Sequence, residues 1–296
     1  DNAWNVSGER HVYLVYKGSD ELTTVTTIDN ESAGITMSMK NYDSAAAGLS
    51  DSIGGGYGNG SVKQNLLNSK LQNGYPVTKN GTSLRTLFSN GETVNHLFRK
   101  DIYDETGYYE YSSFENYAYL NDNGNFTVYD QIGTPEHGGA YYFKRGNFMP
   151  YNRIEAGKYA TDNCNLYDED GNPLDTSHPR YEERLYKTQG TNDFYFGMYM
   201  EVNFLQPKGG KAIHTNASTN ETTTSDMIYE FNGDDDLWVF IDNVLVLDIG
   251  GIHDAHSGYI NFATGKVHVQ LTKNNSVDTT ITELYRNAQV FPDGST

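Results

Sequence analysis

Hydrophobic and polar residues alternate over several short stretches of this chain, a pattern typical of β-strands with one buried face. The clearest stretch is "FYFGMYMEVNF", residues 194–204. One face of it carries Phe194, Phe196, Met198, Met200, Val202 and Phe204, and the other carries Tyr195, Tyr199, Glu201 and Asn203. Shorter runs at 11–17, 21–28 and 35–40 predict further strands. Strands with one core face and one wetter face favour a sandwich of two sheets.

Two segments have helical spacing instead. In "SVKQNLLNSKLQNG", residues 61–74, the apolar side chains follow the turns of a helix: Val62, Leu66, Leu67 and Leu71. Ser61 is placed to cap the start of this helix and Gly74 to end it. A second short helix is predicted over 83–91, "SLRTLFSNG", with Ser83 as its cap. We expect both helices to decorate a β scaffold and to bury their apolar faces in its core.

Tyr and Phe residues are dense between 103 and 129. Their rings could form a platform on which sugars stack, or they could line a half-buried pair of strands with "NDNGN", 121–125, as the turn. We favour the strand pair. The polar stretch that follows the strand at 194–204, "PKGGKAIHTNASTNETTTSD", is predicted to be a mobile loop or an insertion that touches a ligand. "MIYEF" then resumes a strand.

The composition supports an all-β fold. With 24 Tyr and 30 Gly, the chain is rich in residues that fit pleated strands and their turns. The net charge of −18 argues against nucleic acid as a partner, because such a surface repels phosphates. It suits a soluble extracellular protein or a cation binder. No apolar run reaches the length of a membrane span. The single cysteine, Cys164, excludes a disulfide framework, and no neighbouring His or Lys marks it as reactive.

Three adjacent aspartates, Asp234–Asp236, stand directly before the most apolar part of the chain. Asp242-Asn243 separates "LWVFI" from "VLVLDI" and is a strong hairpin signal. If the two strands pair back from that turn, Leu237 faces Asp248, and Asp235 lies near Gly250. The triplet then meets the loop "GGIHDAHSG" at one end of the hairpin, and Asp242 lies about 20 Å away at the other end.

This convergence predicts a site for a hard cation. Several carboxylates and backbone carbonyls are the oxygen ligands that Ca²⁺ prefers, and without an ion the crowded carboxylates would repel one another. The candidate metal ligands are Asp234, Asp235, Asp236, His253 and Asp254, and the candidate ligand-binding residues are Gly250, Gly251 and His256.

Two other interpretations of these residues remain open. The aspartates could simply cap a hydrated turn, as acidic turns often do. Alternatively, His253 and His256 could bind zinc or another transition metal together with Asp254. This spacing lies in a loop rather than on a helix, and no cysteine accompanies it.

The stretch "FNGDDDLWVFIDNVLVLDIGGIHDAHSGYINFATGKV", residues 231–267, resembles the fibro-slime domain of bacterial cell-surface proteins, a branch of the PA14-like β-sandwich superfamily. Weaker similarity covers most of residues 28–290. The resemblance implies an all-β, PA14-like antiparallel β-sandwich or barrel with a few short helices and long loop insertions. Residues 1–27 would then be leading strands or a linker, and 28–296 a fibro-slime domain that lacks its last strands.

In PA14-type sugar-binding modules two consecutive aspartates joined by a cis peptide bond hold calcium. The resemblance places that pair on Asp234 and Asp235, with Asp236 where such modules usually have glycine. A second loop, commonly with an Asn, completes the site in such modules, and the sequence does not place it.

The resemblance therefore implies an extracellular adhesin or matrix module, anchored to the cell wall through regions outside this chain. It would depend on Ca²⁺ and bind carbohydrate. The alternative is a structural stalk or fibre subunit in which calcium only stabilises a loop. The expected partners are a glycan or other ligand on a host or neighbouring cell, a homopolymer, or a neighbour that donates a strand to an open sheet edge. We expect no enzyme activity, because no nucleophile elbow, P-loop or HExxH motif is present, and no insertion into membranes.

Overall fold

The computed structural model describes residues 24–42, 60–113, 116–130, 148, 150–152, 154–159, 186–188, 193 and 195–290. Side chains at 130, 154–159 and 186–188 are not among the described parts. The predicted strand at 11–17, residues 21–23 of the one at 21–28 and Cys164 lie outside these ranges. The described part of the second run, 24–28, forms isolated bridges of Thr24 with Tyr129 and of Thr27 with Arg99 instead of a continuous strand.

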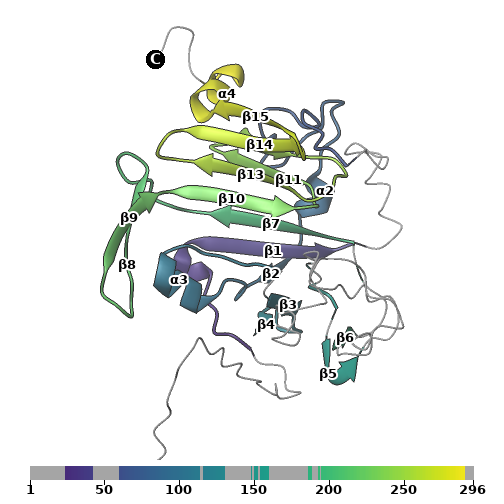
Figure 1. Cartoon of the computed structure of the whole chain (residues 1–296). Helices are drawn as coiled ribbons and strands as arrows, with labels where there is room; N and C mark the ends of the chain where they lie inside the picture. The colour runs from purple at the N-terminus through teal and green to yellow at the C-terminus, as the bar shows by residue number, and fades with distance from the viewer. Residues whose placement is uncertain are drawn as a thin grey trace, which may run out of the picture.

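Two antiparallel sheets form the main body of the fold (Figure 1). The first has the strand order β2 (Glu92–Val94), β1 (Ile35–Asn41), β7 (Phe196–Val202). The second has the order β10 (Ile228–Gly233), β13 (His256–Asn261), β14 (Lys266–Thr272), β15 (Asn275–Thr280). Each sheet has its own buried cluster of apolar residues. The fold is therefore all-β and sandwich-like, as the sequence predicted.

Four two-stranded antiparallel sheets complete the strand inventory of the described residues. They are β3 (Asn116–Leu120) with β4 (Phe126–Asp130), β5 (Ile154–Tyr159) with β6 (Tyr186–Thr188), β8 (Lys211–Thr215) with β9 (Thr222–Asp226), and β11 (Leu237–Ile241) with β12 (Val244–Ile249). The helices are short: η1 (Glu31–Ala33), α2 (Arg85–Phe88), α3 (Lys100–Thr106) and α4 (Ile281–Asn287). None of the helices within the described residues is long and apolar enough to cross a membrane.

The predicted strand pair around 121–125 is present as β3–β4, but the aromatic residues before it have another arrangement. Tyr117 is buried on β3, whereas Tyr103 lies on α3 and stacks on Tyr109 with ring centroids 4.6 Å apart. The α2 helix confirms the second predicted helix, although it begins only after Leu84.

The helix predicted over 61–74 is wrong. The segment is extended and joins the β structure through isolated bridges, among them Leu67–Thr78 and Lys70–Val244. Asn65 and Asn73 have φ of 65° and 51°, which no helix accepts. Leu67 is buried, but it packs in a cluster with Leu84 and Leu87 instead of on a helical face. Tertiary pairing therefore overrides the local spacing.

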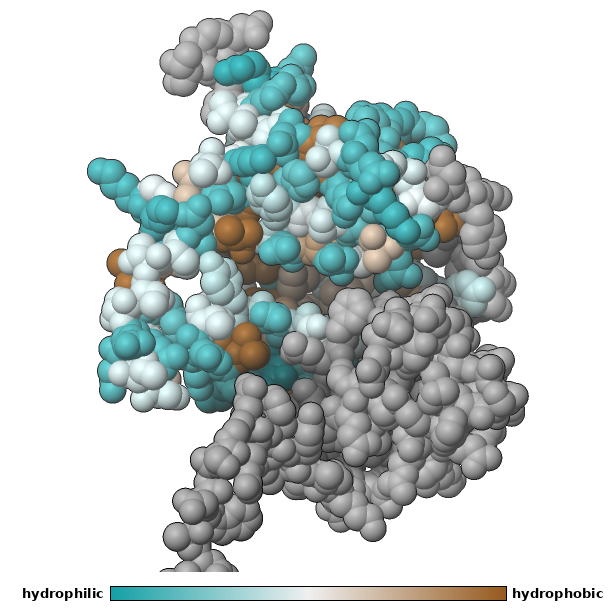
Figure 2. Space-filling view, viewed as in Figure 1, coloured by the Kyte–Doolittle hydropathy of each residue, from teal (hydrophilic) through white to brown (hydrophobic). Residues whose placement is uncertain are grey.

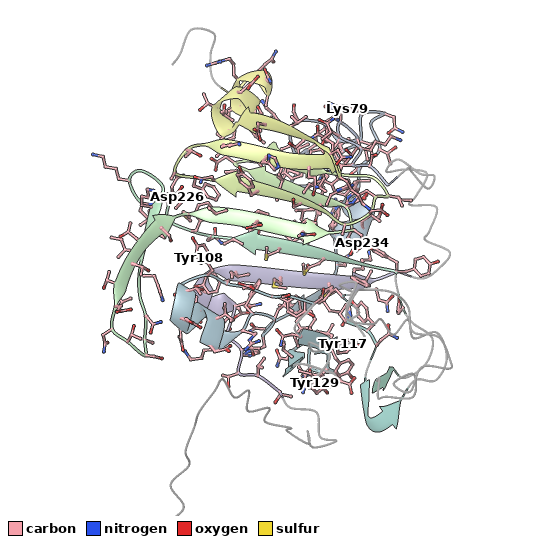
Figure 3. All side chains as sticks on the ribbon, viewed as in Figure 1. Lys79, Tyr108, Tyr117, Tyr129, Asp226 and Asp234 are labelled. Atoms are coloured by element: carbon pink, nitrogen blue, oxygen red, sulfur yellow. The ribbon has the colours of Figure 1, made fainter. Side chains whose placement is uncertain are left out.

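The polar stretch at 207–226 is not the loop that its composition predicted. Most of it forms the β8–β9 hairpin, and the hydroxyl of Tyr108 donates a hydrogen bond to the backbone oxygen of Asp226 at 2.8 Å. In Figure 3 the labelled Tyr108 and Asp226 lie on one side of the molecule, and Asp234 lies at the opposite end of β10. The β8–β9 hairpin is thus far from the acidic triplet.

The core face predicted for 194–204 is only partly correct. Ile35, Met37 and Met39 of β1 are buried, and they pair with Val202, Met200 and Met198 of β7. Met198 and Val202 nevertheless remain 40% exposed. The reason is that β7 is the edge strand of its sheet within the described residues, so there no neighbouring strand on that side places side chains against Met198 and Val202.

Candidate functional site

The β11–β12 hairpin brings the acidic triplet to the predicted end of the molecule. Its turn has positive φ at both central residues, 48° at Asp242 and 67° at Asn243, as the tight hairpin signal predicted. Ile241 pairs with Val244, and Asp242 lies at the opposite end from the triplet.

The predicted register is wrong by one residue beyond the middle of this hairpin. The pairing shifts between Val239 and Phe240, so Trp238 faces Asp248 and Leu237 faces Ile249. A β-bulge inserts one residue into one strand, and pattern reasoning from the turn alone does not reveal it. As a result the indole N–H of Trp238 donates a hydrogen bond to Asp248 at 3.1 Å.

Two chain reversals meet beside the second sheet. One, Asp234–Asp236, joins β10 to β11, and the other, residues 250–255, joins β12 to β13. Because Gly233 of β10 pairs with His256 of β13, both loops leave the sheet at the same place. We call the two segments, Asp234–Asp236 and Gly250–His256, the acidic corner. The structure thus brings the predicted site residues into one region.

The carboxylates of the acidic corner are electrostatically crowded. Partial loss of hydration is the largest cause that raises the pKa of Asp236, to about 6, while the neighbouring His253 and the backbone of Gly251 lower it. Loss of hydration, followed by the charge of Asp234, raises the pKa of Asp235 as well. Asp234 and Asp235 still expose much of their surface, so the crowding lies on one side of the carboxyl groups and water on the other.

The two histidines of the corner are buried. His253 and His256 are 6% and 2% exposed, and their ring centroids lie 5.7 Å apart. His253 Nδ1 lies 2.7 Å from the backbone oxygen of Asp254, and His256 Nε2 lies 2.7 Å from that of Gly60. The other nitrogen of each ring, His253 Nε2 and His256 Nδ1, has no hydrogen-bond partner among the described residues. A buried polar atom without a partner is unfavourable and indicates a missing ligand or water.

Sequence reasoning did not identify the segment that covers this corner, residues 60–65. The Lys63 N–H donates to the Gly250 oxygen at 2.7 Å. Gly251 has φ of +85°, and a Cβ there would lie 2.7 Å from the Cβ of Lys63. At Gly60 a Cβ would lie 2.6 Å from the Asp254 carboxylate. Both positions therefore need glycine, and the glycine-rich composition upstream of residue 60 was the available signal.

Asp248 is a further acidic residue of this region that sequence reasoning did not select. Its carboxylate accepts hydrogen bonds from the Asn65 N–H at 2.7 Å and from Trp238. Burial raises the pKa of Asp248, and these two donors and the charge of Lys79 lower it. Because Asp248 already has protein donors, we assign it to support the corner instead of to bind an ion.

Some features of the acidic corner favour a bound cation and others do not. The described side chains contain no group of three His, Cys, Asp or Glu residues already arranged around one ion. The cis bond expected between Asp234 and Asp235 is also wrong, since the described residues have no cis peptide bond. In favour of a cation are the crowded carboxylates and the unpartnered buried nitrogens. Adjacent Asp side chains would have to rotate inward to share an ion.

Comparisons with known proteins give relatives for part of the chain. Protein psiF of Dictyostelium discoideum is 36% identical over 92 residues, which are 30% of this chain and 13% of psiF. Protein psiI of the same organism is 35% identical over 118 residues, 40% of this chain and 13% of psiI. Protein psiO is 58% identical over 33 residues, 11% of this chain and 4% of psiO. The chain thus spans a small part of the curated relatives that it matches. No family model and no solved structure matches it.

Proposed function

We propose that this chain is an extracellular cell-surface module of the fibro-slime type that binds Ca²⁺ at its acidic corner and, through that ion, a carbohydrate. The observation that carries the proposal is the convergence of the aspartate triplet with residues 250–256, where Asp235 and Asp236 are crowded and His253 Nε2 is buried without a partner among the described residues. Carboxylates with raised pKa values lower their energy by binding either protons or a cation. At the Ca²⁺ concentration outside cells, a cation can take that role.

Each residue of the corner has a distinct task in this proposal. Asp234, Asp235 and Asp236 supply the carboxylate oxygens, and Asp254 can add a further one because it is exposed beside Gly60. The Gly250 oxygen already accepts a hydrogen bond from Lys63, so Gly251 is the better carbonyl donor. When bound, the ion would offer open positions to vicinal hydroxyls of a sugar, which are hard oxygen ligands.

A structural role for the ion is the second candidate. The burial of His253 and His256 favours it, because a buried corner leaves less room for a ligand from solution. In that case calcium would hold the segment 60–65 and the two loops together, as in a stalk or fibre subunit. We propose a binding or structural function in either case, and no catalysis.

A glycan array, probed with the whole chain, separates the two candidates. Carbohydrate binding that requires Ca²⁺, disappears in chelator and is lost in Asp235→Asn but kept in Asp242→Asn would support the proposed function. Asp242 is a matched control, since it is an exposed aspartate of the same hairpin. A calcium-dependent rise in melting temperature without glycan binding would favour the structural role, and glycan binding that survives chelator would contradict the proposed mechanism.

A further inference from the structure

One edge of the first sheet is open and apolar. β7 is hydrogen-bonded to β1 on one side, and on its other side no described strand is hydrogen-bonded to it, although β10 is drawn beside it in Figure 1. Met198 and Val202 are 40% exposed, although the β1 residues directly opposite them, Met39 and Ile35, are buried. Natural sheet edges usually avoid this combination, because an open apolar edge attracts further strands.

Every second residue of β7 directs its backbone N–H and C=O groups away from β1, toward the open edge. The Asn203 N–H donates to Gly34, and the Tyr42 N–H donates to Tyr195. In an antiparallel pair the bonded positions alternate. With the observed register, 197, 199 and 201 therefore bond to β1. The backbone N–H and C=O groups of Phe196, Met198, Met200 and Val202 face outward, and we call these four residues the β7 edge.

The second sheet presents a comparable edge nearby. β10 pairs only with β13 within the described chain, and the Phe262 N–H donates to Met227. The same alternation then leaves the backbone groups of Ile228, Glu230 and Asn232 facing outward. The rings of Phe204 and Phe262, 5.3 Å apart, join the two sheets beyond one end of these edges.

The molecular surface is hollowed where the edges of β7 and β10 lie. Figure 2 shows the middle of the visible face hollowed, with hydrophobic residues gathered along the hollow in the region where Figure 1 draws β7 and β10. Phe204 and Ile228, at the joined end, are 45% and 37% exposed.

We propose that the β7 edge accepts an additional β-strand from a partner polypeptide that alternates apolar residues with Lys or Arg. The apolar residues would cover Met198 and Val202, and main-chain hydrogen bonds would supply much of the affinity. Glu201 on β7 and Glu230 on β10 are exposed, and neither forms an ion pair within the described residues, so a basic outer face complements them. The net charge of −18 disfavours a second copy of this chain as the donor.

A synthetic peptide of the sequence Lys-Val-Lys-Ile-Lys-Val-Lys-Ile-Lys tests the proposal, with a scrambled peptide of equal composition as control. We expect the alternating peptide, and not the scrambled one, to slow hydrogen exchange at the β7 edge amides at least about tenfold. Met198→Pro removes one outward N–H without removing a bond to β1, and edge strands tolerate Pro. It should weaken peptide binding about tenfold, since one main-chain hydrogen bond and its packing are lost. Met198→Ala separates the side-chain contribution.

Ser276→Pro is the matched control for the proline. Ser276 lies on β15, the far edge of the second sheet, and its N–H also faces outward because the Ile281 N–H donates to Gly265 in the same register. This variant should bind the peptide like the unchanged chain. Equal binding by Met198→Pro, or no protection at about 1 mM peptide, would overturn the proposal. Protection of the β7 edge before any peptide is added would also overturn it, because another segment or a second copy would already occupy the edge.

Discussion

Aspartates lie at both ends of the β11–β12 hairpin, but only at the turn end is the carboxylate both hydrogen-bonded and hydrated. At the turn, the Asp242 carboxylate accepts a hydrogen bond from the hydroxyl of Tyr285 at 3.1 Å and otherwise faces water. At the acidic corner, Asp235 and Asp236 lose hydration and repel one another, and among the described residues no Lys or Arg forms an ion pair with them. The same residue type is therefore a turn former at one end and a candidate cation ligand at the other.

Core truncation at each end should have the largest effect. Ile249→Ala removes a fully buried side chain next to Gly250 and should cost about 2–5 kcal/mol of unfolding free energy. Val244→Ala, beside the turn, should cost less because fewer methylenes are removed. Urea unfolding measures both. We expect only Ile249→Ala to weaken calcium binding as well, and an equal loss of affinity in the two variants would contradict the distinction between the ends.

Calcium itself should stabilise the chain through one end only. At about one hundred times its dissociation constant, an ion that binds only the folded state adds about 2.7 kcal/mol. Thermal unfolding with Ca²⁺ and with chelator measures this difference. Asp242→Asn should retain it and Asp236→Asn should lose most of it. If both variants kept the full stabilisation, the ion would bind elsewhere.

Without calcium, the stability of the chain should depend on pH through Asp236 of the acidic corner. The folded-state pKa of Asp236 is raised from 3.8 to about 6, so its contribution to stability is fully present below pH 3.8 and is lost as the pH rises through about 6. In chelator, Asp236→Asn should therefore stabilise the chain at pH 7.5 by on the order of 1–2 kcal/mol, after allowance for solvent screening. This gain should shrink toward pH 4.5. A pH-independent effect of Asp236→Asn would refute the electrostatic explanation.

The turn end should respond to backbone conformation instead of charge. Asn243 has φ of 67°, and a β-branched residue there is strained. Asn243→Val should therefore cost about 1–2 kcal/mol. Denaturant titration checks the loss, with Asn243→Gly as the control that should keep the stability near that of the unchanged chain. Calcium affinity should stay the same in both, because the turn is remote from the acidic corner.

Part of the β11–β12 hairpin and its surroundings could be predicted from the sequence, and part could not. The Asp242-Asn243 turn and the convergence of the triplet with residues 250–256 could be predicted, because a tight turn fixes which strands pair. The register shift between Val239 and Phe240 could not be predicted. This bulge changed the partner of Asp248 from the expected Leu237 to Trp238. The contact of residues 60–65 with this region was also missed. Asn65 and Asp248, which it joins, are 183 positions apart in the chain, and the local spacing of residues 61–74 suggested a helix.

The exposed apolar edge of β7 could not be predicted from the alternation of apolar and polar residues, for a different reason. Alternation identified which side chains share a face, and Met198 and Val202 do share one with Met200. It did not show that this strand ends its sheet, since strand order depends on distant segments. Exposure at that face follows from the topology and not from the residues themselves.

Calorimetric titration of calcium into the chain and into Asp235→Ala tests the central claim most directly, with Asp242→Ala as the control and zinc as a second titrant. We predict one calcium site in the unchanged chain and in Asp242→Ala, and a loss of affinity of about a hundredfold or more in Asp235→Ala. Equal calcium affinity in the chain and in Asp235→Ala, or binding of zinc alone, would contradict a calcium site at the acidic corner.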